Sequence, residues 1–299
     1  LRRLKEVTSR RKERLTSFLL LLPSVILIGV FVYGFIGWTV YVSMSNWRGM
    51  VPDYTFVGLK NYRTLFTLHR FRVGVKNNVI FTVIFIPASI VLGFFMAFLL
   101  DQKVKFEAFF RNIFLFPMAL SFVITGTVWA WIFNPQAGLN LLLEKIGLGF
   151  LQSGWVTDPN VALYSVIIAA TWQMAGFTMA MYLAGLRGIP LELREAAQVD
   201  GATEWQLYQK VIIPLLHPIT VSAVVVLGHI SLKIFDLIFV MTGGGPAMAT
   251  DVPGVYMFTA TFRQDLFNRG AAIGTIMLLM VAIVIVPYLA YSMRAEVER

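Results

Sequence analysis

Long apolar stretches alternate with short polar segments along the whole chain. About 20 apolar residues are enough to cross a lipid bilayer as a helix, so each long stretch predicts a membrane-spanning helix. We place six of them, at about residues 18–44, 77–100, 112–133, 161–186, 213–240 and 270–293. Pro87, Pro117 and Pro287 lie within or near these stretches and are expected to kink them. The pattern predicts an all-α membrane protein.

The most polar interval between two spans covers residues 189–214, and it predicts two short helices rather than an irregular loop. Pro190 suits the first turn of a helix, and Gly201 supplies a break in the backbone. Thr203 and Gln206 fit a capping box that starts the second helix, and a proline near the end of the interval limits its regular hydrogen bonding. Small residues allow another surface to approach closely, and carboxylates offer partners to basic groups. We interpret the interval as a docking element, with a solvated connector as the alternative.

The charge distribution predicts the orientation in the membrane. The chain has 25 Lys and Arg residues against 16 Asp and Glu, a formal net charge of +9. Most of the basic residues lie inside if both termini and the 189–214 interval are cytoplasmic, which the positive-inside preference favours. The surplus therefore indicates topology and needs no nucleic-acid partner. It predicts a cytoplasmic basic tail at residues 1–17, a transmembrane domain at 18–293 and a second cytoplasmic tail at 294–299.

The first outer loop is the exception, because it is also basic. Apolar residues recur at helical spacing within residues 59–75. We therefore expect an interfacial helix that lies on the outer surface and directs its Arg and Lys side chains towards lipid phosphates.

Several chemistries are excluded or disfavoured by the residues. With 0 cysteines there is no disulfide and no thiol nucleophile. His69, His217 and His229 are too far apart in sequence to predict a metal site. Gly243–Gly245 lacks the Gly-Lys-Ser/Thr ending of a phosphate loop and is interpreted as a tight turn on the outer side. No catalytic arrangement stands out, so we do not expect an enzyme.

Polar residues inside two predicted spans are candidates for a solute pathway. Lys233 and Asp236 are three positions apart and can pair on one helix face, either to fix the helix or to line a polar path together with Ser231. In the fourth span Trp172, Gln173 and Phe177 put aromatic rings beside an amide, which suits a sugar. Packing against lipid or protein is the alternative for the aromatic residues.

The 189–214 interval resembles the EAA loop of bacterial ABC importer permeases. The resemblance is carried by Glu195-Ala196-Ala197, by Gly201 four positions later and by Ile213-Pro214 beyond it. It implies that residues 190–211 form coupling helices that sit in a groove of an ATP-hydrolysing subunit. The loop residues implied in coupling are Glu195, Ala196, Ala197, Asp200 and Gly201.

The resemblance extends over most of the chain. Residues 56–62, 134–140 and 235–246 are similar to segments of carbohydrate-type permeases (the maltose, glycerol-phosphate and glucoside type), and specifically of the first permease of such a pair. It implies a six-span MetI-like fold in the bacterial or archaeal cytoplasmic (inner) membrane. The implied partners are a second permease subunit, two ABC ATPase subunits that bind ATP and Mg, and an extracytoplasmic sugar-binding protein.

The resemblance also implies where solute is held. The family's contact positions correspond to Ser121, to Gln173, Met174 and Phe177, and to Ile230, Ser231 and Ile234. The asparagines of the maltose-type fifth span are absent here, which puts a maltodextrin specificity in doubt. We expect import of a sugar or sugar-like solute driven by ATP hydrolysis in partner subunits. The alternatives are a self-contained secondary transporter of a small polar solute and a non-transporting membrane scaffold.

Overall fold

The computed structural model describes residues 18, 20–102 and 104–297, with side chains described as far as residue 288. The predicted tail at 1–17 lies outside the described residues, and so do residues 298–299 of the tail predicted at 294–299, whose first four residues belong to the last helix. The described chain is helical, and its β structure is one isolated bridge between Ser45 and Phe56. Within it, the helices long and apolar enough to cross a membrane are Leu20–Ser43, α4 (His69–Asp101), α8 (Ala162–Gly188) and the Phe267–Tyr288 part of α15 (Phe267–Val297).

Two bent helix pairs bring the candidate spans to six if each pair is counted as one. The first pair differs from the single helix expected at residues 112–133. It consists of α5 (Glu107–Leu115) with the 3-10 turn η2 (Phe116–Ala119), followed by α6 (Phe122–Ile132) at an angle of 100°. Pro117 is the second residue of η2 and Leu120 is extended, so the backbone leaves the helical path there. Ser121 then caps α6 by accepting a hydrogen bond from the Ile124 amide.

The second pair corrects the expected fifth span at residues 213–240. A single path runs through α10 (Glu204–Leu207), the π-helical η4 (Tyr208–Ile212) and α11 (Ile213–Leu215), and then bends by 61° into α12 (His217–Leu232). Pro214 and Pro218 lie on either side of this bend and lack the amide hydrogen that a regular helix uses. α12 ends at Leu232, and a separate short helix, α13 (Asp236–Met241), follows.

α4 and α8 form the tightly packed centre of the bundle. A Cβ on Gly93 of α4 would overlap the Thr178 side chain of α8, and one on Gly176 would overlap the Phe114 carbonyl. Gly93 therefore lets α4 and α8 approach at the distance of backbone contact, and Gly176 does the same for α8 and α5. Two buried apolar clusters surround the seam. One includes Phe81, Phe85 and Leu237, and the other joins the C-terminal half of α4 to α8 and η4.

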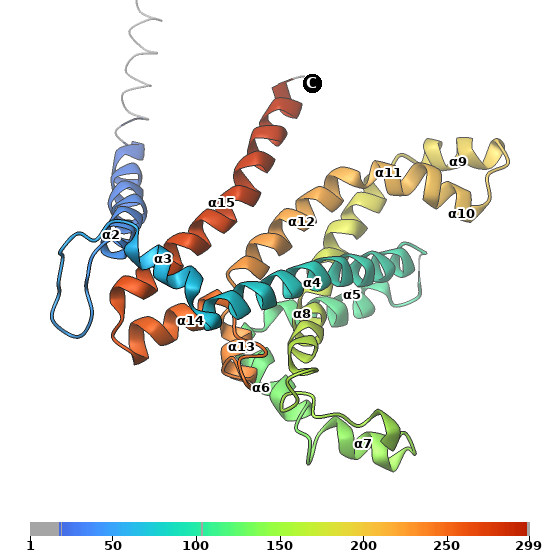
Figure 1. Ribbon diagram of the computed structural model, residues 1–299. Helices are drawn as coiled ribbons and strands as arrows, with labels where there is room; N and C mark the ends of the chain where they lie inside the picture. The colour runs from blue at the N-terminus through green and yellow to red at the C-terminus, as the bar shows by residue number, and fades with distance from the viewer. Residues whose placement is uncertain (1–17, 19, 103, 298–299) are drawn as a thin grey trace, which may run out of the picture.

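The first span and α15 lie beside the bundle (Figure 1). The first span includes the π-helical η1 (Gly29–Gly34) and α2 (Phe35–Ser43), and none of its most apolar window is buried. Near the far end of α15, the Tyr288 hydroxyl lies 3.2 Å from that of Ser222, in the first turns of α12. The C-terminal end of α15 thus lies towards the same end of the bundle as α10 and α11.

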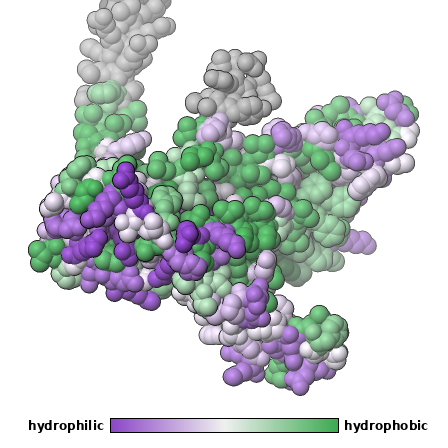
Figure 2. All heavy atoms as spheres, in the orientation of Figure 1, coloured by the Kyte–Doolittle hydropathy of each residue, from purple (hydrophilic) through white to green (hydrophobic). Residues whose placement is uncertain are grey.

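Short helices occupy the connections. α3 (Lys60–Thr67) replaces only the first part of the interfacial helix expected at 59–75, because α4 already begins at His69. Asn61 fixes α3 by donating to the carbonyls of Ser43 and Ser45. The others are α7 (Leu139–Lys145), η3 (Gly149–Leu151), α9 (Leu191–Val199), α14 (Pro253–Phe258) and η5 (Thr259–Arg263). In Figure 2 hydrophilic residues gather at the α9–α10 tip and over α3 and the start of α4, with hydrophobic surface between them.

Candidate functional site

The polar interval folds into two short helices, α9 and α10, as its residues predict. Pro190 is the N-cap of α9 rather than a residue of its first turn. Gly201 follows α9 with a φ of +79°, a conformation that glycine adopts far more readily than other residues. Thr203 and Gln206 form the predicted capping box of α10, with both reciprocal hydrogen bonds present. Together these features define a helix–turn–helix that we call the coupling loop (residues 190–211).

The coupling loop projects from the bundle (Figure 1). It also exposes apolar side chains. Val199 is 88% exposed and Trp205 is 74% exposed. Of the residues predicted to act in coupling, Glu195, Ala196, Asp200 and Gly201 are exposed, whereas Ala197 packs partly against the core. Because a monomeric protein rarely leaves large apolar groups together on a protruding polar segment, this surface is suited to another protein.

An ion pair that the sequence did not reveal fastens the coupling loop to the bundle. An Arg194 Nη1–Asp101 Oδ2 distance of 2.9 Å joins α9 to the C-terminal residue of α4. The other guanidinium nitrogen donates to the Leu186 carbonyl near the end of α8, also at 2.9 Å. Next to it, Arg187 pairs with Glu107 of α5 at 2.7 Å. The coupling loop is therefore attached at once to the ends of α4 and α8, and no local spacing in the sequence predicts partners so far apart.

A groove lies between α4 and the segment that begins with α10. Its volume is about 510 Å³, and its lining is mainly aromatic and aliphatic: Phe94, Phe95, Phe98, Gln102, Glu204, Trp205, Tyr208 and Ile213. Such a lining fits apolar chains rather than a polyhydroxylated solute. The groove is therefore not a candidate solute site.

Apart from Lys233 and Asp236, the residues predicted for the solute pathway fall into two groups. Trp172 is 37% exposed, and its ring lies 5.7 Å from that of Trp129 on α6 in an edge-to-face arrangement. Ser121 is exposed at the start of α6, and Phe177 is only partly buried. In contrast, Gln173 and Ser231 are buried. Only the first group is accessible in this conformation.

Buried Gln173 and Ser231 bond to other parts of the chain rather than lining a surface. Gln173 donates from Nε2 to the Leu120 carbonyl at 2.7 Å, which satisfies a backbone oxygen at the bend before α6. Ser231 donates to the Gly228 carbonyl and accepts a hydrogen bond from Thr82 at 3.1 Å. Both side chains therefore hold helices together in this conformation, and their contact with solute stays a prediction.

Lys233 and Asp236 do not pair on one helix face as expected. The helix ends between them, because Lys233 is the C-cap of α12 and Asp236 lies in the first turn of α13. Both are exposed, and no ion pair joins them among the described residues. A cation at a helix C-terminus and an anion at a helix N-terminus each complement the helix dipole, so each charge has a local role.

The histidines were not expected to form a metal site, and the glycine run was not expected to form a phosphate loop. The described residues contain no group of three or more His, Cys, Asp or Glu side chains that could hold a metal ion. Gly243 and Gly244 have φ values of +62° and +90°, so the glycine run is a tight turn between α13 and α14.

Comparisons with known proteins agree on one class. Residues 89–295 match the family model described as binding-protein-dependent transport system inner membrane component. A probable ABC transporter permease of Pyrococcus horikoshii is 50% identical over 93% of this chain and 96% of its own length. The xylose/arabinose import permease of Haloferax volcanii is 38% identical over 89% of this chain and 84% of its own. A crystal structure of a bacterial ABC transporter involved in alginate import has the same fold, with a TM-score of 0.79, 22% identity and coverage of 97% of this chain and 99% of that one.

Proposed function

This chain belongs to the family of binding-protein-dependent transport system inner membrane components, and on that premise we propose that it carries a sugar or sugar-like solute into the cytoplasm. The chain is a permease subunit of an ATP-driven importer, not a self-contained secondary transporter. ATP hydrolysis takes place in partner subunits, and the permease itself is not an enzyme.

The coupling loop is the observation that carries the proposal. Its exposed apolar residues and its carboxylates, Glu195 and Asp200, form a protruding surface attached to two core helices. We assign this surface to an ABC ATPase, one of two that bind ATP and Mg. The other assigned partners are a second permease subunit and an extracytoplasmic sugar-binding protein.

The coupling loop then sets the orientation. If it meets an ATPase, its end of the bundle is cytoplasmic, and the end of α15 near α12 is cytoplasmic too. With six spans, both termini lie in the cytoplasm of a bacterium or archaeon, and the chain is a multi-pass protein of the inner membrane. The loops at the N-terminal ends of α4 and α8 then face the binding protein.

Transport follows from alternating access. ATPase closure moves α9 and α10, and the helices attached to them rock between inward- and outward-facing states. Nucleotide and loaded binding protein favour the outward-facing state only if each binds that state more tightly. The accessible polar and aromatic residues, Ser121, Trp172 and Phe177, are the candidates for contact with solute, together with Lys233 and Asp236.

The test is ATPase activity of the co-purified complex in lipid, with and without its binding protein. The panel contains a monosaccharide, a disaccharide, a glucoside, a polyol and glycerol phosphate. Stimulation by one loaded solute supports the proposal and identifies the solute. If no ATPase co-purifies under mild conditions, the assignment of the coupling loop is wrong.

A charge reversal tests the docking surface directly. We expect Glu195→Lys to lower solute uptake into liposomes at least about tenfold, which corresponds to about 1.4 kcal/mol of lost coupling. Lys105→Glu, an exposed position between α4 and α5 and outside the coupling loop, is the control charge reversal and should transport normally. Normal uptake by Glu195→Lys would contradict the docking role.

A further inference from the structure

α4 connects the coupling loop to the opposite end of the bundle. Its last residue, Asp101, holds Arg194 of α9. Its first turns hold the segment between α13 and α14, which we call the glycine loop (residues 242–252). A helix rises 1.5 Å per residue, so Arg70 and Asp101 are roughly 46 Å apart along α4. One helix therefore contacts both the loop assigned to the ATPase and the loop at the other end.

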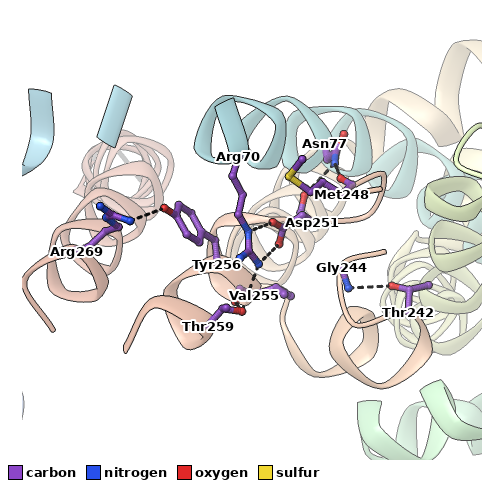
Figure 3. A network of polar contacts seen from close by, with 10 residues as sticks. All are labelled: Arg70, Asn77, Thr242, Gly244, Met248, Asp251, Val255, Tyr256, Thr259 and Arg269. Carbon is purple, nitrogen blue, oxygen red and sulfur yellow. Dashed lines mark hydrogen bonds and ion pairs between the residues drawn. The ribbon is translucent and has the colours of Figure 1, made fainter. Parts of the chain in front are cut away.

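The attachment at the N-terminal end of α4 is specific (Figure 3). Arg70 pairs with Asp251 through an Nε–Oδ2 contact of 2.5 Å, and its Nη2 donates to the Thr259 hydroxyl at 3.3 Å. About two turns further along α4, Asn77 donates to the carbonyls of Met248 and Asp251, both at 3.0 Å. The glycine loop is thus held at two levels of α4.

Breaking the Arg70–Asp251 ion pair costs free energy, because the pair is largely buried. The Asp251 side chain is 1% exposed, and burial raises the pKa of its carboxyl group, whereas the Arg70 hydrogen bond and charge lower it. Removing one partner of a buried ion pair leaves an uncompensated charge. The Arg70 guanidinium also lies 4.6 Å from the Tyr256 ring centroid, so a lysine does not reproduce its contacts.

Internal hydrogen bonds make the glycine loop a compact unit. The hydroxyls of Thr242 and Thr250 lie 2.6 Å apart, and Thr250 donates to the Gly245 carbonyl at 2.7 Å. The Gly244 amide donates to the Thr242 hydroxyl at 3.4 Å. Because these hydrogen bonds join its two ends, the glycine loop should move as one unit with α4. Its tip residues Gly243 and Ala247 remain exposed.

The middle of α4 is also fixed. The helix continues through Pro87, and Thr178 of α8 donates to the Ser89 carbonyl at 2.7 Å. Gly93 contacts the same threonine. α4 and α8 therefore move together, since a displacement of one requires the other to leave a close-packed seam.

We propose that α4 is a strut that transmits movement between the coupling loop and the glycine loop, with Arg70 and Asp251 as the positioning residues at its outer end. The inference rests on the proposed function, which places the glycine loop on the side of the binding protein. The glycine loop then adds to the surface that senses the loaded binding protein, and α4 relays that contact to the ATPase through Asp101 and Arg194.

The first experiment removes the outer attachment. In proteoliposomes, Asp251→Asn and Arg70→Lys should keep the basal ATPase rate but lose stimulation by loaded binding protein by at least about fivefold, the lower range of allosteric coupling. The loading solute is the one that gives the largest stimulation in the panel above. Arg72→Lys, at an exposed neighbouring position on α4, is the matched control and should behave as the unmodified protein. Undiminished stimulation in folded Asp251→Asn and Arg70→Lys overturns the proposal.

A covalent link provides the second experiment. The chain has 0 cysteines, so Gly74→Cys with Val252→Cys introduces one unambiguous pair. A Cβ on Gly74 lies 3.5 Å from the Val252 Cα, which is close enough for a disulfide. Oxidation should restore stimulation to Asp251→Asn, and a reductant should remove it again.

The same link keeps the proposal testable if Asp251→Asn does not fold. In the otherwise unmodified chain, the oxidised pair should retain full stimulation, because the loop stays attached to α4 throughout the cycle. Loss of stimulation on oxidation overturns the proposal. Failure of the proposed function looks different, because the unmodified complex itself then shows no ATPase or no stimulation.

Discussion

The coupling loop and the seam between α4 and α8 are built from similar small residues but place them in opposite surroundings. Nothing lies within 4 Å of a Cβ built on Gly201, whereas one built on Gly93 would overlap a threonine of the neighbouring helix. Gly201 allows the backbone a positive φ, whereas Gly93 allows two helices to pack closely together. Substitution at the seam should therefore affect folding, whereas substitution in the coupling loop should affect transport.

The largest expected effect is at the seam. Gly93→Val forces a branched side chain into Thr178 and the Met179 backbone, so we expect a loss of about 3 kcal/mol or more and little folded protein. The measurements are the yield of monodisperse protein and the midpoint of thermal unfolding in detergent. Gly37→Val, in the first span with open space around the glycine, is the control and should fold. Equal midpoints for the two variants would remove the contrast between the regions.

The second effect is on transport without loss of the fold. Gly201→Val imposes a positive φ on a β-branched residue, which costs roughly 1–2 kcal/mol and should change the angle between α9 and α10. We expect the unfolding midpoint to fall by much less than in Gly93→Val, whereas solute uptake is lowered at least about tenfold. Gly201→Asn, which tolerates positive φ better, should keep most of the uptake. If both variants transport equally, the conformation of the turn is not what matters.

The smallest expected effect on transport is that of a substitution at a buried residue of the helix bundle. Gln173→Leu leaves the Leu120 carbonyl without its donor, so we expect a loss of about 1–3 kcal/mol of stability and an unchanged order of preference among solutes. Gln209→Leu, at an exposed position of η4, should change neither property. A changed solute preference in Gln173→Leu would restore this residue to the solute pathway.

The coupling loop was readable from sequence because its structure is local. The Gly201 turn and the capping box of Thr203 and Gln206 depend on residues within a few positions of one another. The positions of the long helices were also readable from uncharged stretches, as the agreement between residues 161–186 and α8 shows. The bend at Leu120 follows the kink expected at Pro117, but neither its angle of 100° nor the break after Leu232 was readable, because a hydropathy pattern records apolar content and not the direction of the chain.

By itself the sequence determined the all-helical membrane character, the family and the coupling loop, since each depends on composition or on contiguous residues. Only the tertiary structure decided that Gln173 and Ser231 are buried, that Lys233 and Asp236 lie on different helices, and that Arg194 is held by Asp101. It also decided that Arg70 meets Asp251, far along the chain. The sequence shows which residues are charged or polar. Their partners depend on how helices that are far apart in the chain pack against one another.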